Sequence, residues 1–419
     1  MARGTGREAH GIVAARAAVE AVWRIERARV LATLVRFTGD IDTAEELVGD
    51  ALVAALEQWP GEGIPKNAGA WLTSVAKRKA IDGWRRQSRL TEKYALIASS
   101  GVAEAEEPGE IDDDLLRLIF TACHPVLSGP SRVALTLRLL GGLTTDEIAR
   151  GFLVPTATIA QRITRAKKTI AAARVPFEIP QRSELAPRLD AVLGVVYLVF
   201  NEGYSATAGD DWIRPTLCNE ALRLARVLVT LVPREAEAHA LLALLEFQGS
   251  RLAARVTPAG EPVLLDDQDR SRWDHLQIRR GVAALAAADA LAVPRGVYAL
   301  QAAIAQCHAT AAAPEHTDWN EIVALYDALA STTASPVVEL NRAVALSRAG
   351  GVDAALELVD TIAPRLDGYH LLPVVRGDLL ARLGRPAEAR GEFLRAAELT
   401  RNNERERELL LERAAAVVG

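Results

Sequence analysis

Residues 143–168 carry side chains whose types and spacing suit contact with DNA. Apolar residues recur there at helical spacing and predict one buried face, formed by Ile159, Ile163, Ala166 and Ile170. The opposite face is polar and consists of Thr156, Thr158, Gln161, Arg162, Arg165 and Lys168. Thr, Gln and Arg side chains near the start of a helix can reach the edges of DNA bases, and basic side chains farther along the helix can neutralise phosphates. The pattern predicts a DNA-reading helix, with a solvated basic helix as the alternative.

A second helix is expected directly before this one. Thr144 or Thr145 can cap its start, and Glu147 stands where a capping box requires an acid. Pro155 suits the first turn of the helix that follows. A short helix, a tight turn and a basic second helix in one register together predict a helix-turn-helix.

Residues 71–89 predict another basic helix. Its inward positions are Leu72, Val75, Ala76 and Ile81, and its outward side holds six bases and Trp84. The side chains expected to meet DNA there are Lys77, Arg78, Lys79, Asp82, Arg85 and Arg86. Basic side chains interleaved with an aromatic ring and an acid suit single-stranded or distorted DNA. The phosphates need cations, and an unstacked nucleotide base needs a surface to stack on. A basic helix that is simply solvated is the alternative.

The preceding segment, residues 42–59, predicts a helix whose outer face is acidic. Its outward acids are Asp42, Glu46 and Asp50, which suit a basic protein partner rather than DNA. Charge also divides the chain as a whole. Residues 1–175 hold 24 bases and 21 acids, whereas the remainder holds 25 bases and 33 acids. This asymmetry is typical of a nucleic-acid binder with a protein-facing appendage, although drift in surface charge would produce it too.

The composition of the 419 residues favours helices throughout. Half of them are hydrophobic, aromatic residues make up only 5%, and Ala, Leu, Arg and Glu predominate, so we expect an all-α protein. The three cysteines are too far apart for a zinc pattern, and their odd number argues against a disulfide framework, which favours the reducing cytoplasm. No run of 18 apolar residues occurs and the first residues carry charges, so neither membrane spanning nor secretion is expected.

No pattern in the sequence predicts catalysis. A nucleophile elbow, a phosphate-binding loop and a dinucleotide fingerprint are all missing from it, so we expect no enzyme and no cofactor. The carboxylates of Asp266, Asp267 and Asp269 lack the spacing of a calcium loop, and no bound metal is expected.

Two stretches are expected to separate the helical parts. Residues 98–114 contain seven acids and no base, without apolar periodicity, and predict a flexible acidic linker. Prolines at 176, 180 and 187 predict a further hinge. Beyond it, small and large residues near Gly377, Ala389 and Phe393 have the spacing of a tetratricopeptide helix pair, and weaker copies precede it at a 34-residue period. Generic helical hairpins without solenoid stacking are the alternative.

Several of these segments resemble the extracytoplasmic-function (ECF) RNA polymerase sigma factors. The resemblance rests on residues 42–50, on 71–86 and on 147–162, which occur in the order of that family. It implies sigma region 2 over residues 10–97, an acidic linker over 98–114 and a region 4 helix-turn-helix over 115–175. Residues 197–204, 265–274 and 317–319 further resemble the group with a long helical, tetratricopeptide-like extension, here over residues 190–419.

The resemblance implies a role for each candidate residue. Asp42, Glu46 and Asp50 match the segment that docks on core RNA polymerase. Residues 77–86 match the part that opens and reads the −10 element of promoter DNA, and residues 156–168 match the −35 reader. The acidic linker resembles one that runs toward the polymerase active-site cleft. The expected partners are therefore core RNA polymerase and promoter DNA.

The extension is expected to regulate or complete the factor through a protein or small-molecule partner. Its candidate contact residues lie in polar runs amid apolar helices: Asn201, Tyr204, Asp266, Gln268 and Arg270. Burial of such side chains demands specific hydrogen bonds, either against the front domains or within the array itself. The alternative function is that of a polymerase-independent helix-turn-helix regulator whose helical array acts as a sensor or scaffold.

Overall fold

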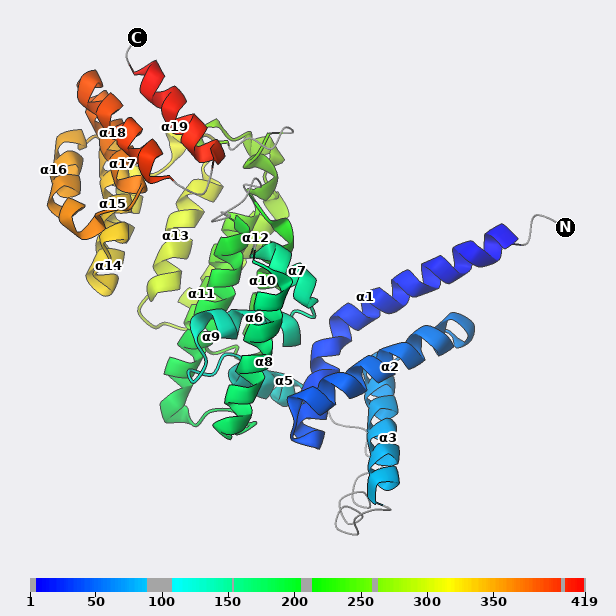
Figure 1. Cartoon of the computed structure of the whole chain (residues 1–419). Coiled ribbons are helices and arrows are strands. Elements are labelled where there is room, and N and C mark those ends of the chain that lie inside the picture. Colours follow the sequence, from blue (N-terminus) through cyan, green and yellow to red (C-terminus); the bar gives the residue numbers. More distant parts are fainter. Residues whose placement is uncertain are drawn as a thin grey trace. The chain divides into compact units, whose positions relative to one another are not determined.

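The computed structural model describes residues 5–88, 108–152, 154–204, 213–257, 263–400 and 404–417. Within these ranges the chain forms helices and no β-strand, which confirms the all-α prediction (Figure 1). The chain divides into two compact units, a front unit of Met1–Val195 and a rear unit of Val196–Gly419. No helix among the described residues is both long and apolar enough to cross a membrane.

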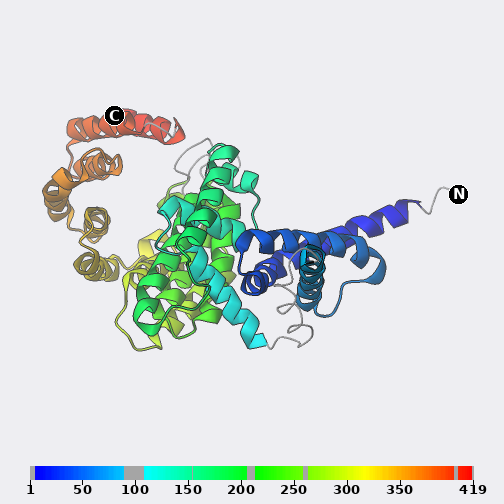
Figure 2. The same cartoon turned by 60° about the horizontal axis from the view of Figure 1, so that its bottom comes forward.

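The first three helices of the front unit are α1 (Thr5–Thr38), α2 (Ile41–Glu62) and α3 (Ala68–Ser88). Helices α1 and α2 are separated at Gly39, which adopts φ 71°, and the side chain of Asp40 accepts a hydrogen bond from the Thr43 amide at 2.7 Å. Helix α2 continues through Pro60 and ends at Glu62, where Gly63 adopts φ 86°, and residues 63–67 separate it from α3. Helices α1 and α2 lie side by side, and α3 packs against both (Figure 2).

The second half of the front unit comprises α5 (Pro108–Ala122), α6 (Gly129–Leu139), α7 (Thr145–Gly151) and α8 (Thr156–Ala172). The expected linker is therefore too long at its C-terminal end, since α5 already begins at Pro108. Proline is favoured in the first turn of a helix, and acids there interact well with the helix dipole. Asp114 is fully buried in α5 and pairs with Arg36 at 2.9 Å and Arg117 at 2.6 Å. Residues 98–107 lie outside the described part.

Helix α9 (Arg182–Tyr204) contains the boundary between the two units. Pro187, which was expected to lie in a hinge, is inside this helix, so only Pro176 and Pro180 precede it. Pro187 is the sixth residue of this helix, so its missing amide hydrogen costs the helix one backbone hydrogen bond, to the Ser183 carbonyl. Within the front unit, Arg188 of α9 donates to the Phe120 carbonyl at 3.2 Å and Leu189 is buried.

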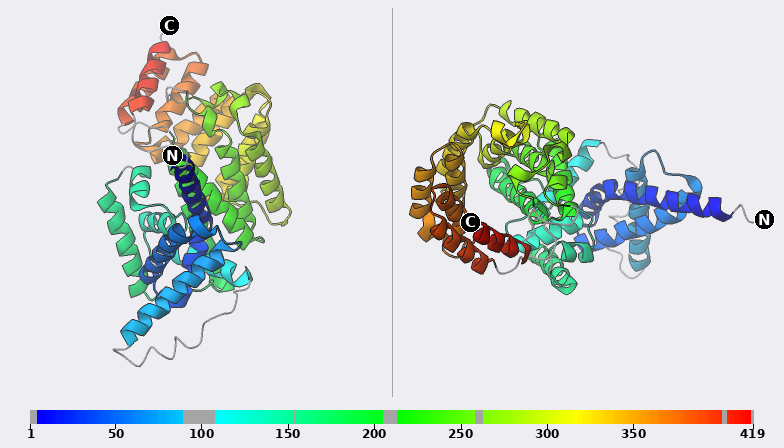
Figure 3. Two further views of the ribbon diagram at one scale, coloured as in Figure 1. Left: turned by 90° about the vertical axis from the view of Figure 1, so that its right-hand side faces the viewer. Right: turned by 90° about the horizontal axis from the view of Figure 1, so that it is seen from above.

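The rear unit consists of paired helices joined by short turns, except for a longer connection over residues 250–274 between α11 and α12. After α9 come α10 (Pro215–Leu231), α11 (Ala236–Gly249), α12 (His275–Asp289), α13 (Val297–Thr310), α14 (Trp319–Thr333), α15 (Pro336–Arg348), α16 (Val352–Ile362), α17 (Leu371–Arg382), α18 (Pro386–Leu399) and α19 (Glu404–Ala416). Short 3-10 turns are η2 (Leu252–Ala254), η3 (Leu265–Asp267), η4 (Arg270–Arg272), η5 (Pro314–His316) and η6 (Ala363–Leu366). Helices α14 to α19 follow one another in a curved row (Figure 3, right).

The packing of α17 on α18 has the small-to-large fit that the repeat pattern predicts. A Cβ atom at Gly377 would lie only 2.8 Å from the Phe393 ring, so the ring fills the space that glycine leaves. The first residues of α16 and α18, Val352 and Pro386, are 34 positions apart, which is the expected period. Helices α11 and α12 repeat the same device, with Gly281 against the ring of Phe247.

Candidate nucleic-acid and protein-binding surfaces

The helix-turn-helix forms as its local sequence predicts. Thr144 caps α7, because its hydroxyl accepts from the Glu147 amide at 3.2 Å while Glu147 accepts from the Thr144 amide at 2.7 Å. This is the expected capping box. Pro155 occupies the N-cap position of α8 rather than its first turn. The Thr156 hydroxyl donates to Asp146 at 2.9 Å and ties the start of α8 to α7.

Helix α8 has the two faces expected of it. Its buried residues are Ile159, Ile163, Ala166 and Ile170, as predicted. All six polar candidates are exposed or half-exposed: Thr156, Thr158, Gln161, Arg162, Arg165 and Lys168. Arg162, Arg165 and Lys168 form no ion pair with any residue of the described ranges. The three charges are therefore available to an anionic partner such as DNA.

Helix α3 presents a basic side, with differences from the expected register. Its buried residues are Leu72, Ala76, Ala80 and Ile81, whereas Val75 is partly exposed. The reason is the regular four-residue step from 72 to 76 to 80, which continues one stripe of the helix. The side chains of Arg78, Lys79, Asp82 and Arg85 are exposed and that of Lys77 is half-buried. The side chain of Arg86 lies outside the described residues.

The expectation that Trp84 faces outward is wrong. Its ring stacks on Phe37 of α1 with centroids 5.2 Å apart and an interplanar angle of 29°. The ammonium of Lys77 lies 5.6 Å from the centroid of the same Phe37 ring. The end of α1 thus covers one face of the Trp84 ring and fixes one side of α3.

The three acids predicted on α2 are all exposed, but two of them have basic partners. Asp42 pairs with Lys167 at 2.5 Å, and Asp50 pairs with Lys79 at 3.5 Å. Glu46 forms no ion pair within the described ranges. The acidic side of α2 therefore contacts bases from both α3 and α8 in the free chain.

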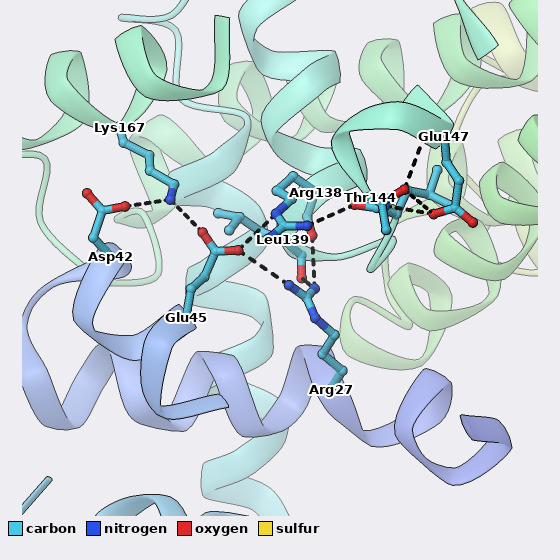
Figure 4. Close-up of polar contacts among 9 residues, drawn as sticks. Arg27, Asp42, Glu45, Arg138, Leu139, Thr144, Glu147 and Lys167 are labelled. Atoms are coloured by element: carbon cyan, nitrogen blue, oxygen red, sulfur yellow. Dashed lines mark hydrogen bonds and ion pairs between the residues drawn. The ribbon is translucent and has the colours of Figure 1, made fainter. Parts of the chain in front are cut away.

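Glu45, which sequence reasoning did not single out, joins four elements of the front unit (Figure 4). Its carboxylate lies 2.5 Å from Lys167 of α8, 3.0 Å from Arg138 of α6 and 3.4 Å from Arg27 of α1. Arg27 is buried and also donates to the carbonyl oxygens of Arg138 and Leu139, at 2.9 and 3.2 Å. Burial lowers the pKa of Arg27 to about 10.

A weak sequence signal pointed to part of this cluster. Lys167 follows the buried Ala166 and lies beside the apolar stripe of α8, so it is the base of that helix closest to the packed side. Nothing local marks Glu45, Arg27 or Arg138, because they are far apart in the sequence and meet only through tertiary packing.

The five candidates in the extension make contacts inside the rear unit. Gln268 is buried and donates to the Val263 carbonyl at 3.2 Å, and Arg270 donates to the carbonyls of His308 and Ala311 at 2.8 and 2.7 Å. Asp266 pairs with Arg348. Asn201 and Tyr204 line a cavity. Packing within the array is thus the role that these contacts support.

Residues that could suggest a reactive or metal-binding centre have structural contacts instead. Asp269 caps η4 through the Ser271 amide at 2.9 Å. The Cys123 thiol is buried beside the Thr136 hydroxyl, and burial raises its pKa to about 11, which disfavours the reactive thiolate. Among the described residues, no group of three or more His, Cys, Asp or Glu side chains is arranged to hold a metal ion.

Comparison with known proteins agrees with this arrangement. Family models for sigma-70 region 2 and sigma-70 region 4 match residues 23–90 and 117–170, and a family of unknown function, DUF6596, matches residues 188–289. The chain is 30% identical to the ECF RNA polymerase sigma factor SigL of Mycobacterium tuberculosis over 155 residues, 36% of this chain and 87% of SigL. A probable ECF sigma factor, SigI of the same species, is 29% identical over 233 residues, 50% of this chain and 80% of SigI.

One relative extends through the rear unit as well. An uncharacterized protein of Rhizobium meliloti is 45% identical over 383 residues, which cover 90% of both chains. The helical extension is thus shared by a second protein nearly in full.

Proposed function

Because the chain belongs to the ECF RNA polymerase sigma factors, we propose that it binds core RNA polymerase and directs transcription initiation from specific promoters. The observation that carries this proposal is the order of three parts in one unit. An acidic helix, α2, precedes a basic helix, α3, and a helix-turn-helix follows at α7 and α8. On α8, the side chains of Arg162, Arg165 and Lys168 form no ion pair with any described residue. An operator-binding regulator needs only the last of these parts.

In this proposal α8 reads the −35 element of the promoter. Thr156, Thr158 and Gln161 lie near its start, where side chains reach base edges in the major groove. Arg162 and Arg165 follow six and nine residues after Thr156, and the exposed Lys168 follows twelve residues after it, where a basic side chain can neutralise a phosphate. The absence of ion pairs at these three bases, within the described ranges, supports this role because no internal acid must be displaced.

Helix α3 is the proposed −10 reader. Arg78, Lys79, Asp82 and Arg85 are exposed on one basic surface, which suits a strand separated from its duplex. Lys77 contributes charge beside the Phe37 and Trp84 rings. Arg86 belongs to the proposed set by its position in the sequence.

The proposed polymerase-docking surface is the acidic side of α2. Glu46 is exposed and unpaired within the described ranges, whereas Asp42 and Asp50 are paired with Lys167 and Lys79. A basic polymerase surface would compete with these two lysines, and their release would leave them to DNA. Polymerase docking and promoter binding would then support each other.

The extension is proposed to modulate this activity. The match with SigL covers only 36% of this chain, so most of the chain lies outside the part that it shares with SigL. The rear unit is a folded array with its own cores and cavities, which suits a regulatory partner or ligand. We further propose the cytoplasm as the site of action, since promoter DNA is the substrate of the complex.

Retention on immobilised core RNA polymerase tests the docking surface. We expect the wild type to be retained at moderate salt and Glu46→Lys to be released at lower salt, because the new charge repels a basic partner. Glu357→Lys, on the exposed side of α16, is the matched control and is expected to behave as the wild type. Failure of the wild type to bind polymerase, together with specific DNA binding, would favour the polymerase-independent regulator.

A further inference from the structure

A polar cavity of about 340 Å³ lies inside the rear unit, between α9, α11, α13, α14 and α15. Its volume is within the range of small-molecule sites. It adjoins a larger cavity of about 670 Å³, with which it shares Leu265, His308, Tyr326 and Asn341. The lining of the smaller cavity holds a positive charge without a negative one, and this indicates which kind of molecule could occupy it.

Arg251 is the one charged side chain that lines the smaller cavity, and the described lining includes no carboxylate. His308 is neutral at pH 7, because burial and the nearby Arg251 and Arg270 lower its pKa to about 4. Arg251 itself forms no ion pair with any described residue. Because no described carboxylate pairs with Arg251, its positive charge is uncompensated, and burial and then the charge of Arg255 lower its pKa.

The guanidinium of Arg251 has donors to spare. One terminal nitrogen, Nη2, donates to the Tyr204 hydroxyl at 2.7 Å and to Gln248. Its Nε and Nη1 atoms make no hydrogen bond within the described ranges. A guanidinium with free nitrogens matches the two oxygens of a carboxylate or phosphate.

Three further polar groups that line the cavity make no hydrogen bond within the described residues. The amide of Asn201 and the hydroxyl of Tyr326 belong to half-buried residues, whereas Asn341 is exposed and lies where solvent also reaches it. Burial raises the pKa of Tyr326 to about 12, so its phenol is a hydrogen-bond donor at neutral pH. By contrast, Tyr197 already donates to Gln301 at 3.2 Å. Polar groups inside proteins are nearly always hydrogen-bonded, to the protein, to water or to a ligand.

We infer that this cavity binds a small organic anion, whose carboxylate or phosphate group pairs with Arg251 and whose hydroxyl, carbonyl or amide groups meet Asn201, Tyr326 and Asn341. The arginine supplies the charge selectivity. The amides supply both donors and acceptors and so select a ligand with polar substituents rather than a bare ion. The inference concerns the rear unit alone and does not depend on the proposed transcription activity.

Calorimetric titration of the full chain, without polymerase or DNA, tests the site. The probes are 4-hydroxybenzoate, lactate and phenyl phosphate, each beside a neutral counterpart: 4-hydroxybenzamide, lactamide and phenol. Inorganic phosphate tests for adventitious ion binding. We expect saturable binding of at least one organic anion, at least tenfold tighter than its neutral counterpart. The carboxylate and phosphate probes distinguish which anionic group the site accepts.

Two variants locate the binding. Arg251→Gln removes the charge, and Asn341→Asp adds a repelling carboxylate at a nearly isosteric residue whose amide has no partner in the described part, so the fold is retained. Each is expected to weaken binding at least tenfold, while Arg279→Gln on the exposed side of α12 leaves it unchanged. The inference is overturned if no organic anion binds saturably, if only inorganic phosphate binds, if the neutral probes bind equally well, or if Asn341→Asp binds as tightly as the wild type.

Discussion

The ammonium of Lys167, on the proposed DNA-reading helix α8, lies 2.5 Å from a carboxylate oxygen of Glu45 on α2, the proposed polymerase-docking helix. The same ammonium lies 2.5 Å from Asp42. Both carboxylates favour the charged form of Lys167 and outweigh the effect of its burial, so the pKa of Lys167 is raised. Lys167 therefore joins regions 2 and 4 in the free chain. In contrast, Arg162, Arg165 and Lys168 of the same helix form no ion pair with any described residue.

Glu45→Gln is expected to destabilise the front unit. The change removes the negative charge opposite the buried Arg27, and loss of one partner from a buried ion pair costs about 3 kcal/mol. Thermal and urea unfolding of the full chain measure the loss in the free energy of unfolding. Glu46→Gln, which is exposed and unpaired within the described ranges, is expected to change stability by less than about 0.5 kcal/mol. Equal stability of the two variants would contradict the role of Glu45.

Two glycines of one helix pair are expected to respond in opposite directions. In Gly377→Ala the new Cβ would lie 2.8 Å from the Phe393 ring, and such overpacking costs about 1 to 3 kcal/mol. In Gly391→Ala the new Cβ meets nothing within 4 Å, so higher helix propensity is expected to stabilise α18 by about 0.5 to 1 kcal/mol. Thermal unfolding of both variants checks the opposite signs.

Stability of the rear unit is expected to fall as the pH falls through the titration of His308. The pKa of His308 is about 4 in the folded chain, below its ordinary 6.5, chiefly because of burial and then Arg251 and Arg270. Between these values the unfolded chain binds a proton that the folded chain does not, so folding becomes less favourable, by about 2 kcal/mol at pH 5. His308→Gln should flatten this part of the unfolding profile from pH 7 to 5, and exposed His275→Gln should not.

The bases of α8 are expected to differ in how they contribute to promoter binding. Arg162→Ala or Arg165→Ala should lose about 1 to 3 kcal/mol on a promoter fragment and discriminate less between sequences if each side chain reads a base. Lys168→Ala should weaken binding uniformly and reduce the salt dependence by about one charge. Fluorescence anisotropy at several salt concentrations separates the two effects. Unchanged affinity of both arginine variants would remove α8 from the −35 assignment.

Local features of the fold could be predicted from the sequence, because short-range patterns determine them. The Thr144–Glu147 capping box and the buried stripe of α8 follow from spacing within a few residues. The start of α5 could not be predicted, because a run of acids after Pro108 is typical of a disordered linker, whereas Asp114 has basic partners from α1 and α5. The ion pair between Arg36 of α1 and Asp114 joins segments far apart in the sequence, and no local sequence pattern reveals such a contact.

The candidate surfaces follow the same rule. The exposed polar face of α8 could be found by helical periodicity, and so could the acids of α2. The Glu45 cluster could not, since Arg27, Arg138 and Lys167 are 18, 93 and 122 positions away from it. The cavity beside Arg251 draws on five helices of the rear unit, and only Asn201 and Tyr204 of its lining are among the contact residues predicted from the sequence.

Run-off transcription with purified core RNA polymerase tests the central claim most directly. Promoter fragments enriched with the full chain in its native host serve as templates, and polymerase alone is the control. We predict specific run-off products only when the chain is added, with output reduced by Arg165→Ala and retained by Arg279→Gln. Specific DNA binding without any chain-dependent transcript, from every enriched fragment, would contradict the claim that this protein acts as a sigma factor.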